Sequence, residues 1–112
     1  MKQLNCYNWS KLSNIPMSLN KVRSLFNNIH RISEKTHHLG DNFLSYGQER
    51  YMFVQTGECE LKYENNDIIK IQKDQFIFIP KGNFFIKVTS QIPLTYIYVW
   101  LKDGEKAFLS LE

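Results

Sequence analysis

The 112-residue chain is long enough for one domain and too short for two. Hydrophobic residues make up 43% and aromatic residues 14% of the chain, which excludes a disordered protein and allows a sizeable core. It contains no apolar run of about 18 residues, and its N-terminus lacks the apolar stretch of a signal peptide. The sequence therefore predicts a soluble, cytoplasmic protein without a membrane contact.

The net charge of +3 is unevenly distributed along the chain. Residues 1–40 carry six lysines and arginines against the single acid Glu34, whereas residues 41–112 carry eight basic and ten acidic side chains. A basic segment is able to touch nucleic acid, but these charges are neither clustered nor interleaved with aromatic residues. We interpret them as a solvated surface.

We expect three segments in chain order. Residues 1–22 read as an N-terminal arm, residues 23–102 as a β-barrel and residues 103–112 as the start of a truncated C-terminal helix. Residues 19–32 fit either a helical face or a strand. The polar residues 33–42, which include the pair His37-His38, are predicted to form an exposed connection rather than a metal site.

Residues 51–101 show a run of short apolar segments separated by turns. Residues 58–63 alternate between polar and apolar side chains, which indicates a strand with one wet and one dry face. Residues 76–79 and 96–100 are apolar on both faces. Such strands need cover on two sides, by a barrel interior and by a second layer or a partner.

The order of these features resembles a cupin, and more narrowly the N-terminal sensing domain of AraC/XylS-type transcription regulators. The features are a strand ending in a glycine turn at Gly57, a hairpin, an apolar strand that leads into Pro80-Lys81-Gly82, and a Tyr/Trp-rich strand at residues 95–100. The resemblance implies an all-β, cupin-like double-stranded β-helix (a jelly-roll barrel) followed by a short C-terminal helix. It also favours a strand over a helix for residues 24–32.

Departures from the metal-binding cupin pattern bear on function. Alignment on Gly57 places Arg50 where that pattern has a glutamate, and alignment on Pro80 places Phe85 at a histidine position and Asp74 at the usual glycine. The paired-histidine positions fall around residues 44–46, which contain no histidine. Because a cupin metal needs three or four converging N/O ligands, we expect no metal and no cofactor.

Without a metal, the barrel interior is expected to be lined by apolar and aromatic side chains: Tyr51, Phe53, Leu61, Phe76, Phe78, Phe85, Tyr98 and Trp100. These residues are either packed core or the wall of a small-ligand pocket. Arg50 and His30 are the expected polar contacts, since an arginine beside aromatic rings binds carboxylates or phosphates well. The predicted ligand-binding residues are His30, Arg50, Tyr51, Phe53, Phe78, Phe85, Tyr98 and Trp100.

The resemblance implies a non-enzymatic role as the effector-binding and dimerisation domain of an AraC-type regulator. In that role the chain binds a small-molecule effector, forms a homodimer and reaches DNA only through a helix-turn-helix half that lies outside it. A metal-free cupin enzyme, such as a sugar epimerase or isomerase, is an alternative that requires a His–Tyr pair, with His30 and Tyr51 or Tyr98 as candidates. A passive dimerisation module, using residues 95–101 or the terminal helix, is the third.

Overall fold

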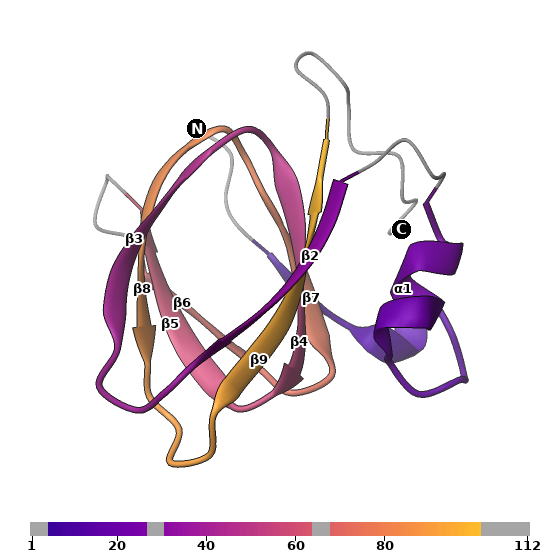
Figure 1. Ribbon diagram of the computed structural model, residues 1–112, viewed down its shortest axis with the longest axis horizontal. Helices are drawn as coiled ribbons and strands as arrows, with labels where there is room; N and C mark the ends of the chain where they lie inside the picture. The colour runs from indigo at the N-terminus through magenta and orange to yellow at the C-terminus, as the bar shows by residue number, and fades with distance from the viewer. Residues whose placement is uncertain (1–4, 27–30, 64–67, 102–112) are drawn as a thin grey trace.

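A computed structural model describes residues 5–26, 31–63 and 68–101 of the chain. Their strands form two antiparallel sheets that enclose a barrel (Figure 1). The larger sheet has the order β1-β7-β4-β9-β2, and the smaller one has the order β3-β8-β5-β6. The predicted all-β, cupin-like fold is therefore confirmed, while residues 103–112, with the predicted C-terminal helix, lie outside the described part.

The elements follow one another along the chain with short connections. In order they are β1 (Cys6–Asn8), the 3-10 turn η1 (Trp9–Lys11), α1 (Leu19–Ser24), β2 (Arg31–His37), β3 (Asn42–Gly47), β4 (Arg50–Thr56), β5 (Glu58–Tyr63), β6 (Ile68–Gln72), β7 (Gln75–Ile79), β8 (Gly82–Val88) and β9 (Leu94–Trp100). Within the described ranges, no helix is long and apolar enough to cross a membrane.

The segment that follows the arm corrects two expectations. Residues 19–24 form helix α1, whose first turn is capped by the Ser18 hydroxyl, which accepts a hydrogen bond of 3.1 Å from the Lys21 backbone N–H. Of the strand predicted over residues 24–32, only Arg31 and Ile32 are extended among the described residues, and they begin β2. The predicted polar connection at residues 33–42 is wrong for its first half, because β2 continues to His37.

Two separate clusters of buried side chains make up the core. One fills the barrel and includes Met52, Leu61, Ile77, Ile86 and Tyr96. The other lies on the outer face of the larger sheet, where Trp9, Val22 and Phe26 of the arm pack against it. Figure 1 shows α1 outside the barrel, beside this sheet. The arm thus supplies the second layer that the two-sided apolar strands require.

Left-handed backbone conformations mark two of the turns. Gly57, between β4 and β5, has φ of 82°, and a Cβ atom built there would lie 2.7 Å from the carbonyl oxygen of Pro93. Asp74, between β6 and β7, is the described non-glycine residue with positive φ, at 64°. Aspartate tolerates this region better than most residues, so it serves where the cupin pattern has glycine.

Candidate functional site

The inward face of β2 is polar, unlike the inward faces of the strands beside it. Arg31, Ser33, Lys35 and His37 alternate along β2, and their cross-strand partners on β9 are Trp100, Tyr98, Tyr96 and Leu94. Because β2 and β3 are edge strands of different sheets, they are not paired with each other. A polar inner face is tolerated beside such an opening, where water reaches the side chains.

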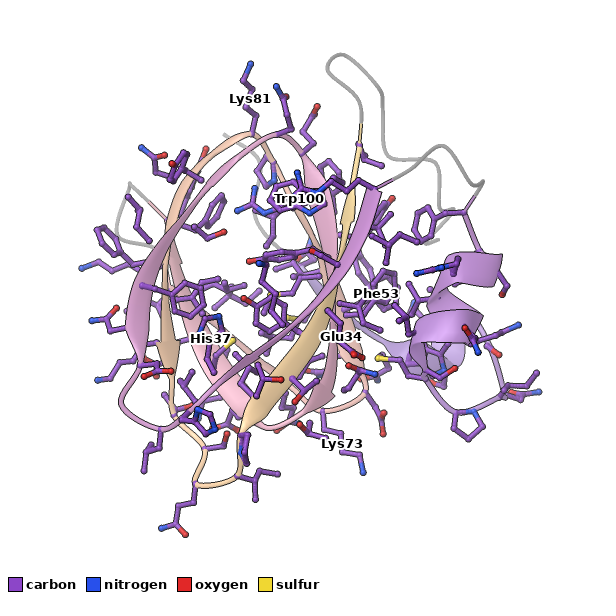
Figure 2. All side chains as sticks on the ribbon, in the orientation of Figure 1. Glu34, His37, Phe53, Lys73, Lys81 and Trp100 are labelled. Carbon is purple, nitrogen blue, oxygen red and sulfur yellow. The ribbon has the colours of Figure 1, made fainter. Side chains whose placement is uncertain are left out.

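A pocket of about 250 Å³ lies along this opening. It is lined by side chains of β2, β3 and β9, most of them aromatic or basic: Lys35, His37, Phe43, Leu44, Ser45, Tyr46, Tyr96, Tyr98 and Trp100. Figure 2 shows His37 and Trp100 within the outline of the barrel, whereas Phe53 lies on the side facing α1.

Arg50 is the buried charge of this region, with 0% of its surface exposed. Its guanidinium donates to the Gln48 carbonyl oxygen at 2.9 Å and to the Ser45 hydroxyl at 2.6 Å. It also lies 5.3 Å from the Tyr98 ring centre and 5.1 Å from that of Trp100. No described carboxylate forms an ion pair with it, and its Nε atom is buried without a hydrogen-bond partner.

Trp100 connects Arg50 to the open edge of the barrel. The Arg31 guanidinium lies 5.3 Å from the ring of Trp100, so two arginines contact one indole. The indole N–H points towards the Ser33 hydroxyl at 3.4 Å. These contacts hold the ring at the boundary between the buried cation and the exposed end of β2, where cation–π contacts stabilise its position.

The other end of the pocket holds a hydrogen-bonded histidine and tyrosine. His37 Nε2 lies 3.1 Å from the Tyr96 hydroxyl, and the imidazole stacks on Phe43 with ring centres 4.0 Å apart. Burial lowers the pKa of His37, although Asp41, 3.8 Å away, opposes this shift. Burial also raises the pKa of Tyr96 well above its usual range, with the Tyr98 hydroxyl contributing.

The predicted site residues fall in three different places. Arg50, Tyr98 and Trp100 come together inside the barrel. Placing Tyr51, Phe53, Phe76 and Phe78 in the barrel interior is wrong, because these residues belong to the cluster beneath the arm. Placing Phe85 there is wrong as well, since it projects from the outer face of the smaller sheet and is 54% exposed. His30 lies outside the described residues.

Sequence reasoning missed Ser45, His37 and Tyr96. His37 was placed in a loop because the polar inner face of β2 hides the strand pattern. The signal that could have found the strand is the β-branched pair Ile32 and Thr36 on its other face. Among the described residues, no three His, Cys, Asp or Glu side chains are placed to hold a metal ion.

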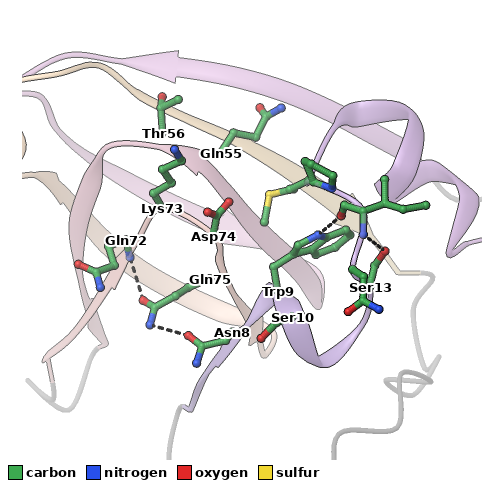
Figure 3. A pocket seen from close by; sticks show the side chains of 14 residues that line it. Asn8, Trp9, Ser10, Ser13, Gln55, Thr56, Gln72, Lys73, Asp74 and Gln75 are labelled. Carbon is green, nitrogen blue, oxygen red and sulfur yellow. Dashed lines mark hydrogen bonds between the residues drawn. The ribbon is translucent and has the colours of Figure 1, made fainter.

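A second, larger hollow of about 900 Å³ lies between the arm and the β6–β7 turn (Figure 3). Many of its polar groups are already bonded to one another. The Gln75 side chain accepts from the Gln72 backbone N–H at 3.0 Å and donates to Asn8 at 3.4 Å, and the Trp9 indole donates to the Ile15 carbonyl at 2.7 Å. The Gln75–Asn8 bond joins the arm to the barrel, and so does the bond of 2.8 Å from the Trp9 backbone N–H to the Asp74 carbonyl oxygen. We therefore interpret this hollow as part of the structural contact between the arm and the barrel.

Comparison with solved structures identifies the fold as that of the cupins. A DUF861 family protein from Thermotoga maritima has a TM-score of 0.59 and 19% identity, over 88% of this chain and 100% of the other. A cupin protein from Bacteroides fragilis has a TM-score of 0.58 and 20% identity, over 82% of this chain and 80% of the other.

ToxT from Vibrio cholerae, solved with (E)-4-(8-methylnaphthalen-1-yl)but-3-enoic acid, has a TM-score of 0.56 and 12% identity. The match covers 67% of this chain and 31% of ToxT. At these identities the likeness establishes the fold alone. The chain matches no protein-family profile and no curated protein sequence.

Proposed function

We propose that the chain is a small-molecule sensing domain that binds an amphipathic carboxylate, in the manner of the N-terminal half of an AraC-type regulator. The observation that carries this proposal is Arg50, a buried guanidinium without a carboxylate partner among the described residues. A buried charge is costly unless it is paired, and neutral hydrogen bonds and aromatic rings compensate for it only in part. An incoming anion would complete the compensation.

The pocket, two of whose walls, Tyr98 and Trp100, contact Arg50, favours a ligand with a flat or aliphatic tail. Tyr98, Trp100 and Phe43 provide apolar surface, while Lys35 adds positive charge at the open edge. A pocket of about 250 Å³ is small by comparison with typical ligand sites, which span about 300–1,000 Å³. The ligand is therefore compact. ToxT, which shares this fold, was solved with a carboxylic acid that carries a naphthalene ring.

This function contains no catalytic step for the chain. In a regulator, ligand binding acts only if two arrangements of the protein bind the ligand with different affinity. β3 supplies Ser45 to the buried network, and this strand sits at an open edge of its sheet. It is therefore the element whose position a bound anion would affect most directly.

Thermal denaturation with matched probes tests the proposal. The probes are (E)-4-(8-methylnaphthalen-1-yl)but-3-enoic acid and 4-phenylbutanoate, each compared with the corresponding alcohol. At about ten times its Kd, a bound acid stabilises the domain by about 1.4 kcal/mol. This raises the Tm of a domain this small by about 5 °C. The neutral alcohols are expected to give a much smaller shift.

Two variants locate the binding. Arg50→Met removes the buried charge and should abolish the difference between acid and alcohol. Arg23→Met removes an exposed guanidinium from α1 and should leave the difference intact. Equal shifts for acids and alcohols, or an unchanged response in Arg50→Met, would contradict the proposed role of Arg50.

A second candidate function is metal-free epimerase or isomerase chemistry, and the observation in its favour is the His37–Tyr96 pair at 3.1 Å. Such a pair could exchange a proton with a bound sugar. The strongly raised pKa of Tyr96 makes the phenol a weak acid, which disfavours this function. The test is NMR in D₂O with a panel of keto sugars. Exchange of a carbon-bound proton that is lost in His37→Gln would support catalysis, and no exchange would reject it.

A further inference from the structure

The outer face of the smaller sheet carries an exposed apolar patch. Four of the seven large apolar side chains that are exposed in the described residues project from this face: Leu44 (47%), Tyr46 (69%), Phe85 (54%) and Ile68 (60%). The corresponding face of the larger sheet is covered by the arm of the same chain. The two sheets therefore differ, because the larger one is covered by the arm, whereas no segment among the described residues covers this face of the smaller one.

The strand register places three of these side chains, together with Lys62, in one row across the sheet, and Tyr46 lies in a neighbouring row opposite Asn83. Leu44 on β3 pairs with Phe85 on β8, and Phe85 pairs with Lys62 on β5, which in turn pairs with Ile68 on β6. A hollow of about 320 Å³ lies along this row between Phe85, Ile68 and the charged side chains beside them. Exposed apolar side chains gathered on one face are typical of interaction sites in soluble proteins.

The charges on the same face identify the kind of partner. Glu60 lies between Lys87 and Lys70, its cross-strand neighbours, and Glu58 is 3.5 Å from Lys70. The face thus mixes lysines and glutamates in nearly equal number, which suits neither an acidic nor a basic partner. Under a two-fold axis, Glu60 of one copy would face lysines of the other, and the apolar rows would meet.

We propose that this face, defined by Leu44, Phe85, Lys62, Ile68 and Glu60, is a self-association surface for a second copy of the chain. The inference does not depend on the proposed ligand, because Phe85, Ile68 and Glu60 lie away from the candidate pocket; Leu44 borders both places. Two elements were considered for a passive dimerisation module, residues 95–101 and the terminal helix. The first belongs to β9, which is not an edge strand because it is paired with β4 and β2, and the second lies outside the described residues.

The size of the face predicts a weak dimer. With four strands about 4.8 Å apart and about six residues rising about 3.4 Å each, the face measures about 19 Å by 20 Å. A standard interface buries about 800 Å² of accessible surface on each partner, and this face offers about half that area in projection. Weak, transient association with a micromolar Kd is expected.

Sedimentation equilibrium of the purified chain from about 1 to 500 µM tests the proposal. The wild type should dimerise reversibly, and Phe85→Glu should raise the dimer Kd at least about 30-fold, the effect of removing one well-packed anchor. The matched control is Ile92→Glu, which makes the same change at a residue of similar exposure, 57%, in the loop before β9. This control should keep the wild-type Kd.

A charge exchange adds a test that does not depend on apolar contacts. Glu60→Lys should weaken the dimer about tenfold, and adding Lys87→Glu should restore much of the loss. Circular dichroism spectra confirm that each variant is folded. A wild type that stays monomeric to 500 µM overturns the proposal, and so do equal Kd values for Phe85→Glu and Ile92→Glu. Association with another protein but not with itself overturns it too.

Discussion

Replacing Arg50 with methionine tests whether its guanidinium serves to bind a ligand or to stabilise the fold. Methionine has a similar length and removes the charge from a position with 0% exposure. Where a buried guanidinium pairs with a carboxylate, removing it strands the partner charge and costs about 3–5 kcal/mol. No described carboxylate pairs with Arg50, so that penalty does not arise here.

The remaining contributions largely oppose one another. The substitution leaves the Gln48 carbonyl oxygen without its 2.9 Å donor, at a cost of about 1–3 kcal/mol. Ser45 retains a partner, because the Tyr98 hydroxyl lies 3.1 Å away. Against these losses, the folded state no longer desolvates a cation, and apolar replacement of buried charged groups is often neutral or stabilising by about 1–4 kcal/mol. The expected net change in the free energy of unfolding is within about 2 kcal/mol.

Urea denaturation followed by tryptophan fluorescence and by circular dichroism measures this change. Arg23→Met on α1 is the control and should shift stability by less than about 0.5 kcal/mol, as for other surface substitutions. A loss of about 3–5 kcal/mol in Arg50→Met would refute the reasoning, because it would mean that the guanidinium serves mainly to hold the fold together. A small change combined with loss of the acid-specific Tm shift would assign Arg50 to binding.

Two further predictions concern stability. Burial lowers the pKa of His37 below its ordinary value of 6.5, so the folded state binds this proton less readily than the unfolded state. Its contribution to stability is present above about pH 6.5 and is lost as the pH falls towards the lowered pKa. Urea titrations from pH 8 to pH 5 should therefore show a shallower loss of stability in His37→Gln than in the wild type. Gly57→Ala should destabilise the domain by about 3 kcal/mol or more, because its φ is 82° and the new Cβ would lie 2.7 Å and 2.8 Å from backbone atoms of Pro93 and Leu94. Gly40→Ala, with φ of 90° but no atom within 4 Å of the new Cβ, should cost about 1 kcal/mol, and equal losses in thermal denaturation would show that the contact at Gly57 is relieved without cost.

The sequence predicts which face is buried for strands with one polar and one apolar face. For strands that are apolar on both faces, it does not predict which face points into the barrel. β5 alternates cleanly, and the structure buries Cys59 and Leu61 as the pattern indicates. In β4 and β7 both faces are apolar, so periodicity says nothing about which one faces the barrel. Tyr51 and Phe53 were expected in the interior, yet these rings pack beneath the arm instead.

β2 was missed for a different physical reason. A strand pattern requires a dry face, and the inward side chains of β2 are polar because the barrel is open beside them. The same opening creates the candidate pocket. The prediction therefore failed at β2, where the usual alternation of polar and apolar side chains is absent, and such exceptions are typical of functional sites. Arg50 stands out in the sequence because an isolated arginine at the start of an apolar strand has few structural explanations, and its role in binding stays a prediction.

The position of Arg50 also explains how the barrel can tolerate a buried charge. The guanidinium is at the end of β4, and its cross-strand neighbours on the inward face are Ile79 and Trp100. Apolar side chains fill the barrel on one side of it, and on the other side Trp100 separates it from the exposed Arg31. The free-energy cost of burying the guanidinium is reduced, because aromatic faces and two oxygen acceptors replace part of the lost water. The Nε atom of Arg50 still lacks a hydrogen-bond acceptor. A carboxylate that reached Arg50 through the pocket between β2 and β3 would supply one.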